Sequence, residues 1–170
     1  MRLRASHRRG VSGGAVRMSK SSPAMVAVAA GLAAGLADIP AAFVIYQPAT
    51  PTQILQAVGS GLMGSGIFEM GMMGAVIGAA CHFAISIILA ALYLAGARFA
   101  PVLLERPLLS GVVYGTFVFG VMNAVVVPLS LAAERSTPPD HITLLGWAAN
   151  VLFGVVLAWV VARMSRPRPA

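Results

Sequence analysis

Four strongly polar side chains stand inside otherwise apolar stretches of this 170-residue sequence: Asp38, His82, Asn123 and Asn150. A carboxylate and an imidazole that lie together can share a proton and change charge near neutral pH. Ionisable groups within apolar segments are costly and usually functional, so Asp38 and His82 are the candidates for proton-linked chemistry. The two amides need no such purpose, because asparagine side chains also serve as hydrogen-bonding links between membrane helices.

The segments that must position these side chains are long enough to cross a bilayer. Hydrophobic residues make up 58% of the chain and charged residues 10%, against roughly 25% charged in soluble domains. Apolar runs of about 20 residues form spanning helices, and none of these runs alternates as barrel strands do. The sequence therefore predicts an all-α membrane protein, a four-transmembrane-helix bundle within residues 24–163, with spans at 24–46, 70–97, 108–132 and 142–162.

Depth along the predicted spans places the four polar side chains in one layer. At about 1.5 Å per residue, Asp38 lies about 4–5 Å to the outer side of the membrane centre and His82 within about 2 Å of it. Asn123 and Asn150 lie about 6 Å and about 3 Å to the outer side. We therefore expect a polar layer that faces the bundle interior, with Pro40 kinking the first helix just past Asp38.

Small residues support this facing independently. Membrane helices approach each other closely where their side chains are small. In the second span, Gly74 and Gly78 precede His82 at steps of four, and in the fourth span Gly154 follows Asn150 at the same step, so each pattern shares one helical face. The predicted helix-packing positions are Gly31, Gly35, Gly74, Gly78, Gly111, Gly115 and Gly154.

Basic residues alternate between the two ends of the spans. The tail before residue 24 holds Lys and Arg but no acid, the connection 47–69 holds neither Lys nor Arg, and Arg returns after the second and fourth spans. This positive-inside pattern predicts a bacterial inner-membrane protein with both termini cytoplasmic. The net charge of +7 then needs only anionic lipid as a partner, and we expect no nucleic acid.

The N-terminal end leaves two alternatives open. We expect residues 1–23 to form a basic, disordered cytoplasmic tail, and residues 164–170 a second basic tail. Met18 offers an alternative start, so residues 1–17 are either a tail or untranslated. A signal peptide cleaved near residue 37 is the alternative to a retained first span, but the apolar run continues to Tyr46, which favours retention.

The connection between the first two spans is too long for a turn and too apolar for a free loop. Thr52 can begin a short helix that reaches about Gln56, and a glycine-rich stretch follows it. Residues 52–66 are therefore either an interfacial helix on the outer surface or a re-entrant segment buried in protein. The interfacial helix is favoured because re-entrant backbone needs a protein-lined cavity.

Other chemistries have weaker support. Thioethers between Met63 and Met73 suit Cu(I), but Met also fills apolar gaps. His82 and His141 lie at different depths, which argues against a bis-His haem. Ser86 lies one turn from His82, as a Ser-His nucleophile would need, but a serine in a membrane helix more often bonds to its own backbone. We find no phosphate loop or dinucleotide motif. The sequence thus predicts no catalytic residue, no metal and no cofactor.

Five stretches in order resemble one known family: "AGLADI", "ILQAVGSGLMG", "HFAIS", "RPLLSGVVYG" and "VMNAVVVPLS". Together they are similar to the YagU-like proteins, small four-span bacterial inner-membrane proteins with no assigned activity. The resemblance covers roughly residues 26–132, and the last span departs from it. It implies four helices and an inner-membrane location, and it brings no catalytic residues.

Two classes of function remain open from the sequence. In the first, the protein is a small transport, proton-linked or sensing protein built around Asp38 and His82. In the second, it is a non-catalytic structural or accessory subunit whose polar layer only fixes helix packing. We expect no enzymatic activity in either class. Because the chain is short for a complete transport pathway, a homo-oligomer or an unidentified membrane partner is expected.

Overall fold

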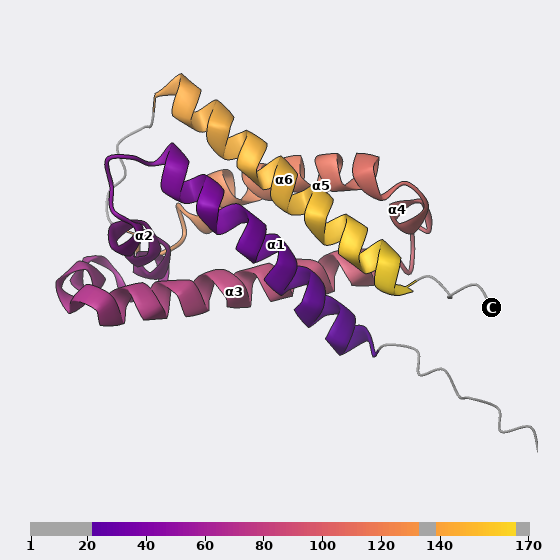
Figure 1. The fold of residues 1–170 in the computed structure, drawn as a ribbon, viewed down its shortest axis with the longest axis horizontal. Helices are drawn as coiled ribbons and strands as arrows, with labels where there is room; N and C mark the ends of the chain where they lie inside the picture. Colours follow the sequence, from indigo (N-terminus) through magenta and orange to yellow (C-terminus); the bar gives the residue numbers. More distant parts are fainter. Residues whose placement is uncertain (1–21, 133–138, 166–170) are drawn as a thin grey trace, which may run out of the picture.

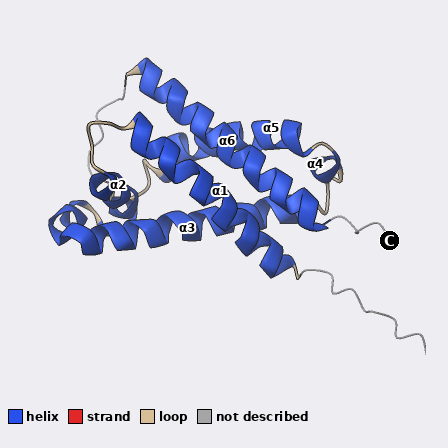
Figure 2. Ribbon diagram, in the orientation of Figure 1, coloured by secondary structure: helices blue, strands red, loops and turns tan. Residues whose placement is uncertain are grey.

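The computed structural model describes residues 22–132 and 139–165, so the disorder predicted for residues 1–21 lies outside the described part. The helices are α1 (Pro23–Ile45), α2 (Pro51–Met63), α3 (Gly71–Gly96), α4 (Val102–Glu105), α5 (Pro107–Val121) and α6 (Asp140–Ser165). A 3₁₀ helix (Ser65–Met70) leads into α3, and a π-helix (Met122–Val126) continues α5. Figure 2 shows these helices joined by short loops, with no strand among the described residues.

Four helical segments are long and apolar enough to cross a membrane. They are Pro23–Ile45, Ser65–Gly96, Pro107–Val126 and Asp140–Ser165. This confirms the predicted all-α class and the four-helix bundle. The chain is therefore an integral, multi-pass membrane protein.

The spanning helices pack in a fixed order. α1 and α6 run side by side and cross over α3 and α5 (Figure 1). α1 packs against both α3 and α6, and α6 packs against α5. α2 and α4 lie at opposite ends of the bundle (Figure 1). Thus α1 and α6 form the centre of the fold, while α3 and α5 contact each other little.

Helix starts follow the local sequence. Ser22 caps α1, with its hydroxyl accepting from the Met25 N–H, and Pro23 occupies the first helical turn. α2 begins with a capping box in which Thr50 and Gln53 satisfy each other's backbone N–H groups. The cap is therefore Thr50 and not the predicted Thr52, because Pro51 is well suited to the first helical position.

α2 extends further than expected and lies across α3. The helix continues through the glycine-rich stretch to Met63, because Gly59 packs against the backbone of Gly78 on α3. Gln56 is 3% exposed, and its Nε2 donates to the carbonyl oxygens of Gly71 at 2.8 Å and Ile67 at 3.3 Å. Figure 1 shows α2 nearly end-on and α3 lengthwise. The segment therefore forms one helix packed on α3, and its position relative to the membrane surface stays a prediction.

The third span ends earlier than its predicted boundary at residue 132. The Val127 N–H bonds to the Met122 carbonyl at 2.8 Å, five residues back, which is the π-helical pattern. Pro128 follows and has no N–H with which to continue a helix. The helical span therefore stops at Val126.

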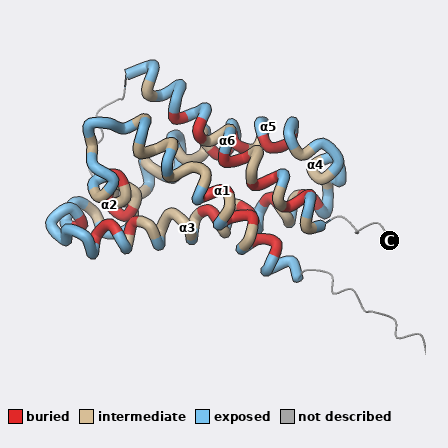
Figure 3. The backbone as a smooth tube through the Cα atoms, in the orientation of Figure 1, coloured by how far each residue is buried: buried red, intermediate tan, exposed pale blue. Residues whose placement is uncertain are grey.

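Small residues form the contacts between the spanning helices. The core gathers Ala30 and Ala34 of α1 with Phe153 and Leu157 of α6, and the buried stretches follow the helix crossings (Figure 3). A Cβ added to Gly31 would lie 2.5 Å from the Ile87 Cα. All seven predicted packing glycines lie where an added Cβ would meet a neighbouring segment at 3.1 Å or less: Gly31, Gly35, Gly74, Gly78, Gly111, Gly115 and Gly154.

Candidate functional site

Asp38 and His82 lie on α1 and α3, two helices that pack against each other. The His82 Nε2 lies 3.2 Å from the Gly35 carbonyl oxygen, one turn before Asp38 on α1. Both residues are half-buried. The structure therefore places the imidazole beside the turn of α1 that precedes Asp38, and the pairing of the two side chains stays a prediction.

Two small residues and one aromatic ring hold this contact. Gly35 has no side chain, so the Phe83 ring and the Ser86 hydroxyl approach within 3.1 Å of the place where its Cβ would be. The Phe83 ring packs edge-on against the His82 ring at 5.4 Å between centroids. The Ser86 hydroxyl donates to the backbone carbonyl of His82 at 2.8 Å, so it bonds its own helix rather than the imidazole.

The two asparagines also bond their own helices. The Nδ2 of Asn150 donates to the Gly146 carbonyl at 3.0 Å, and the Nδ2 of Asn123 donates to the Phe119 carbonyl at 2.8 Å. An added Cβ on Gly115 would meet the Asn150 backbone, so Gly115 is the α5 residue level with Asn150. Asn123 lies eight residues further along, about 12 Å toward the end of the span, and it is exposed. The two asparagines therefore lie at different levels of the bundle, which argues against the predicted single layer.

Besides the His82 contact, two hydrogen bonds between helices come from tyrosines that the sequence patterns did not select. The Tyr114 hydroxyl of α5 donates to the Leu89 carbonyl of α3 at 2.7 Å, and the Tyr93 hydroxyl of α3 donates to the Leu103 carbonyl of α4 at 2.8 Å. The two tyrosine rings meet edge to face at 5.0 Å. A tyrosine inside a predicted span needs a partner for its hydroxyl. The presence of two tyrosines in predicted spans could therefore have indicated hydrogen bonds between helices.

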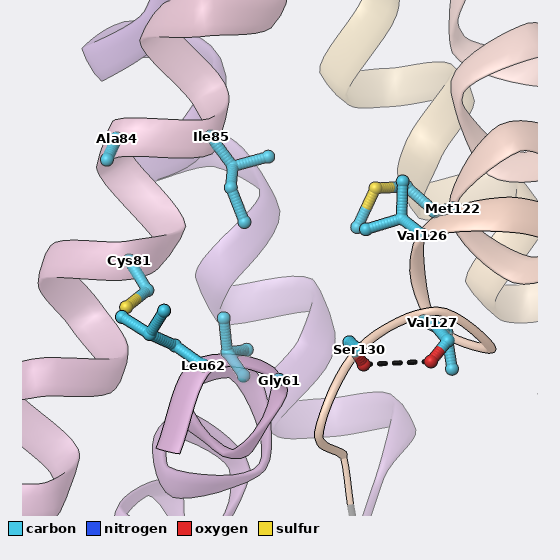
Figure 4. Close-up of a pocket in the computed structure, with 10 residues that line it drawn as sticks. Gly61, Leu62, Cys81, Ala84, Ile85, Met122, Val126, Val127 and Ser130 are labelled. Atoms are coloured by element: carbon cyan, nitrogen blue, oxygen red, sulfur yellow. Dashed lines mark hydrogen bonds between the residues drawn. The ribbon is translucent and has the colours of Figure 1, made fainter. Parts of the chain in front are cut away.

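An apolar cavity of about 300 Å³ opens on the other side of α3 (Figure 4). The adjacent residues Cys81 and His82 face different ways, because Cys81 lines the cavity and His82 contacts α1. The lining residues are Val58, Gly61, Leu62, Cys81, Ala84, Ile85, Met122, Val126, Val127 and Ser130. Neither Asp38 nor His82 lines this space.

Metal and thiol chemistry finds little support in the geometry. Among residues 22–132 and 139–165, no three His, Cys, Asp or Glu side chains gather closely enough to hold a metal ion. The methionines between Met63 and Met73 are exposed on their segments rather than converging. Cys81, the single cysteine, is half-buried in the cavity wall.

Comparisons of the chain with protein-family models, with curated proteins and with solved structures gave no match. The resemblance to the YagU-like proteins therefore stays a prediction from the quoted motifs.

Proposed function

We propose that this integral membrane protein uses the Asp38–His82 pair as a proton-responsive element between α1 and α3, in a small transport or sensing protein of the bacterial inner membrane. One observation carries the proposal. The His82 imidazole contacts the α1 backbone at Gly35, one turn before the Asp38 carboxyl group, between two membrane-spanning helices, where isolated charges are costly.

The chemistry of the pair explains how a proton would change the bundle. Opposite charges on Asp38 and His82 attract. Proton transfer from the imidazolium to the carboxylate removes both charges, and uptake of a proton by the carboxylate removes only its own. In a medium of low dielectric constant this attraction is much stronger than in water. The contact beside it is tightly packed at Gly31 and Gly35, so a change in charge shifts the balance between a closed and a loosened α1–α3 contact.

A structural or accessory role is the second candidate, and specific contacts favour it. Both asparagine amides bond their own helices, and the imidazole already contacts the Gly35 carbonyl. In this role the polar side chains only help to hold the helices together, as do the close packing at the glycines and the tyrosine hydrogen bonds. In either role the chain acts without a catalytic centre, in contact with lipid and with a second copy or another membrane protein.

A proton-flux measurement separates the two candidates. The purified protein is reconstituted in vesicles that contain a pH-sensitive dye, and a pH gradient is imposed while tryptophan emission is recorded. We expect proton movement or a pH-dependent emission change in the native protein. Both responses should be lost in Asp38→Asn and in His82→Gln.

The matched control is Asn123→Ala, because Asn123 is exposed and its amide donates to a carbonyl of its own helix. It should behave like the native protein. If Asp38→Asn and His82→Gln also keep both responses, the proton-responsive role is refuted and the structural role stands.

A further inference from the structure

The cavity beside Cys81 has well-defined ends. At the end nearer α2, the Leu131 N–H donates to the Gly61 carbonyl at 2.9 Å, which joins α2 to the chain that follows the third span. At the other end, the Tyr114 hydroxyl bonds the Leu89 carbonyl and joins α5 to α3. The cavity therefore occupies the space between α3 and the third span, bounded by one hydrogen bond at each end.

The side between α3 and α5 is not closed. These two helices contact each other little, and each packs mainly against α1 or α6. In the close-up, Ile85 and Ala84 lie on one wall and Met122 and Val126 lie on the opposite wall (Figure 4). Access from the bilayer between α3 and the third span is thus the shortest route to the cavity.

The lining offers almost nothing to water or ions. The residues are apolar except for Cys81 and Ser130, and no lining residue carries a formal charge. The Ser130 hydroxyl already donates to the Val127 carbonyl at 2.8 Å, and a thiol is a weak hydrogen-bonding group. Cavities with apolar walls stay dry and bind apolar guests, so the occupant should be apolar as well.

Depth decides which apolar molecule is available. Cys81 lies ten residues into α3, about 15 Å from its start at Gly71, so the cavity reaches well into the hydrocarbon layer. At that depth the surrounding solvent is lipid acyl chains. The connection 47–69 near the cavity holds no Lys or Arg, and the site therefore has no cation with which to select an anionic headgroup.

We propose that the cavity between α2, α3 and the end of the third span binds one acyl chain of a membrane phospholipid, which enters sideways between α3 and α5. Recognition is by the shape of the apolar walls and not by the headgroup. The cavity is lined from a different face of α3 than the one that carries His82, and neither Asp38 nor His82 lines it. The proposal does not depend on the function proposed for that pair.

Photo-crosslinking tests the proposal directly. The native protein is reconstituted in phosphatidylcholine vesicles in which a small fraction of the lipid carries a diazirine in the middle of one acyl chain. After irradiation, mass spectrometry locates the adducts. We expect them to concentrate on the segments Cys81–Ile85 and Met122–Val126, which face each other across the cavity.

Variants that fill the cavity should lower this labelling. Ala84→Phe adds an aromatic ring at the cavity wall. Gly61→Leu adds a branched aliphatic side chain from α2, where an added Cβ meets only Ser130 at 3.6 Å. Either variant should reduce the adducts several-fold while its circular dichroism stays native. The control is Ala148→Phe, the same substitution at an exposed position of α6, which should leave the labelling unchanged.

The single cysteine gives a second readout. In a cavity filled by an acyl chain, Cys81 should react slowly with a small charged thiol reagent added to the vesicles, since only the hydrated thiolate is nucleophilic. Rapid reaction would show a wet cavity and overturn the proposal. Equal adducts in the native protein and in both filled variants would also overturn it, as would labelling by a photoactivatable isoprenol but not by the phospholipid.

Discussion

At the scale of single residues, His82 contacts the backbone of α1 across the α1–α3 contact. Its Nε2 lies 3.2 Å from the Gly35 carbonyl, one turn before Asp38. The carbonyl remains whatever residue stands at position 38. Substitutions of Asp38 therefore test the charge of the pair more than the position of the imidazole.

The first prediction concerns the shape and charge of Asp38. Asp38→Asn should keep the fold with little change in stability, because the amide retains the shape and can still hydrogen-bond. Asp38→Leu should lower the free energy of unfolding by on the order of 1 kcal/mol, since in the proposed pair the His82 imidazole loses its partner. Thermal unfolding in detergent measures both variants. An Asp38→Leu protein more stable than the native one would show that the carboxylate faces lipid instead.

The second prediction concerns Gly31, where α1 comes closest to the α3 backbone. A Cβ at Gly31 would lie 2.5 Å from the Ile87 Cα, and backbone cannot move aside as a flexible side chain can. Gly31→Ala should destabilise the bundle by about 1–3 kcal/mol, the usual cost of overpacking. Gly120→Ala is the control, because nothing lies within 4 Å of its added Cβ. Equal melting temperatures for the two variants would argue against so close a crossing of α1 and α3.

The sequence predicted features that depend on one helix alone, and it did not predict features that depend on how two helices are aligned. The spacing of small residues is a local property, and it selected the faces on which Gly31 and Gly115 meet neighbouring helices. The depth of Asn123 depends on where its helix ends, and the π-helical turn before Pro128 shortened that span. The bond from Tyr114 to the Leu89 carbonyl depends on the register between two helices, which no pattern within one helix reports.

At the scale of elements, α2 is the helix whose position depends most on one side chain. Gln56 is buried and joins α2 to the turn that begins α3 through two carbonyls. The sequence predicted a short helix from Thr52 to about Gln56, because glycines usually weaken helices, whereas the helix continues to Met63. Packing of Gly59 against Gly78 supplies the contact that compensates for this weakness.

The third prediction follows from that anchor. Gln56→Leu removes the amide that donates to the Ile67 and Gly71 carbonyls, which leaves two acceptors without this partner and costs about 1–3 kcal/mol. Hydrogen exchange of residues 51–63 should become faster while exchange in α6 stays unchanged. Met63→Ala, at an exposed position of the same helix, should leave exchange in α2 near native. Unchanged protection in Gln56→Leu would mean that α2 is held by its apolar contacts alone.

At the scale of the whole molecule, the four spans and the distribution of basic residues define an orientation. α1 and α6 are antiparallel neighbours, so residues near Pro23 and Ser165 lie at the same end of the bundle, together with α4 (Figure 1). α2 lies at the opposite end. The connection that contains α2 holds no Lys or Arg, whereas the chain before α1 holds several. By the positive-inside rule, we predict that the end with α4 faces the cytoplasm.

The last prediction tests this orientation. A reporter that is active only in the cytoplasm, fused after Ala170, should be active, because an even number of spans returns the chain to the side on which it began. The same reporter inserted near residue 137, between the third and fourth spans, should be inactive, and a periplasm-specific reporter should give the reverse pattern. Deleting residues 2–17 should leave both results unchanged, since Lys20 and Arg163 keep positive charge beside the first and fourth spans. A C-terminus on the periplasmic side would contradict the orientation while leaving the helix packing intact, and it would place α2 and the mouth of the acyl-chain cavity in the cytoplasmic leaflet instead.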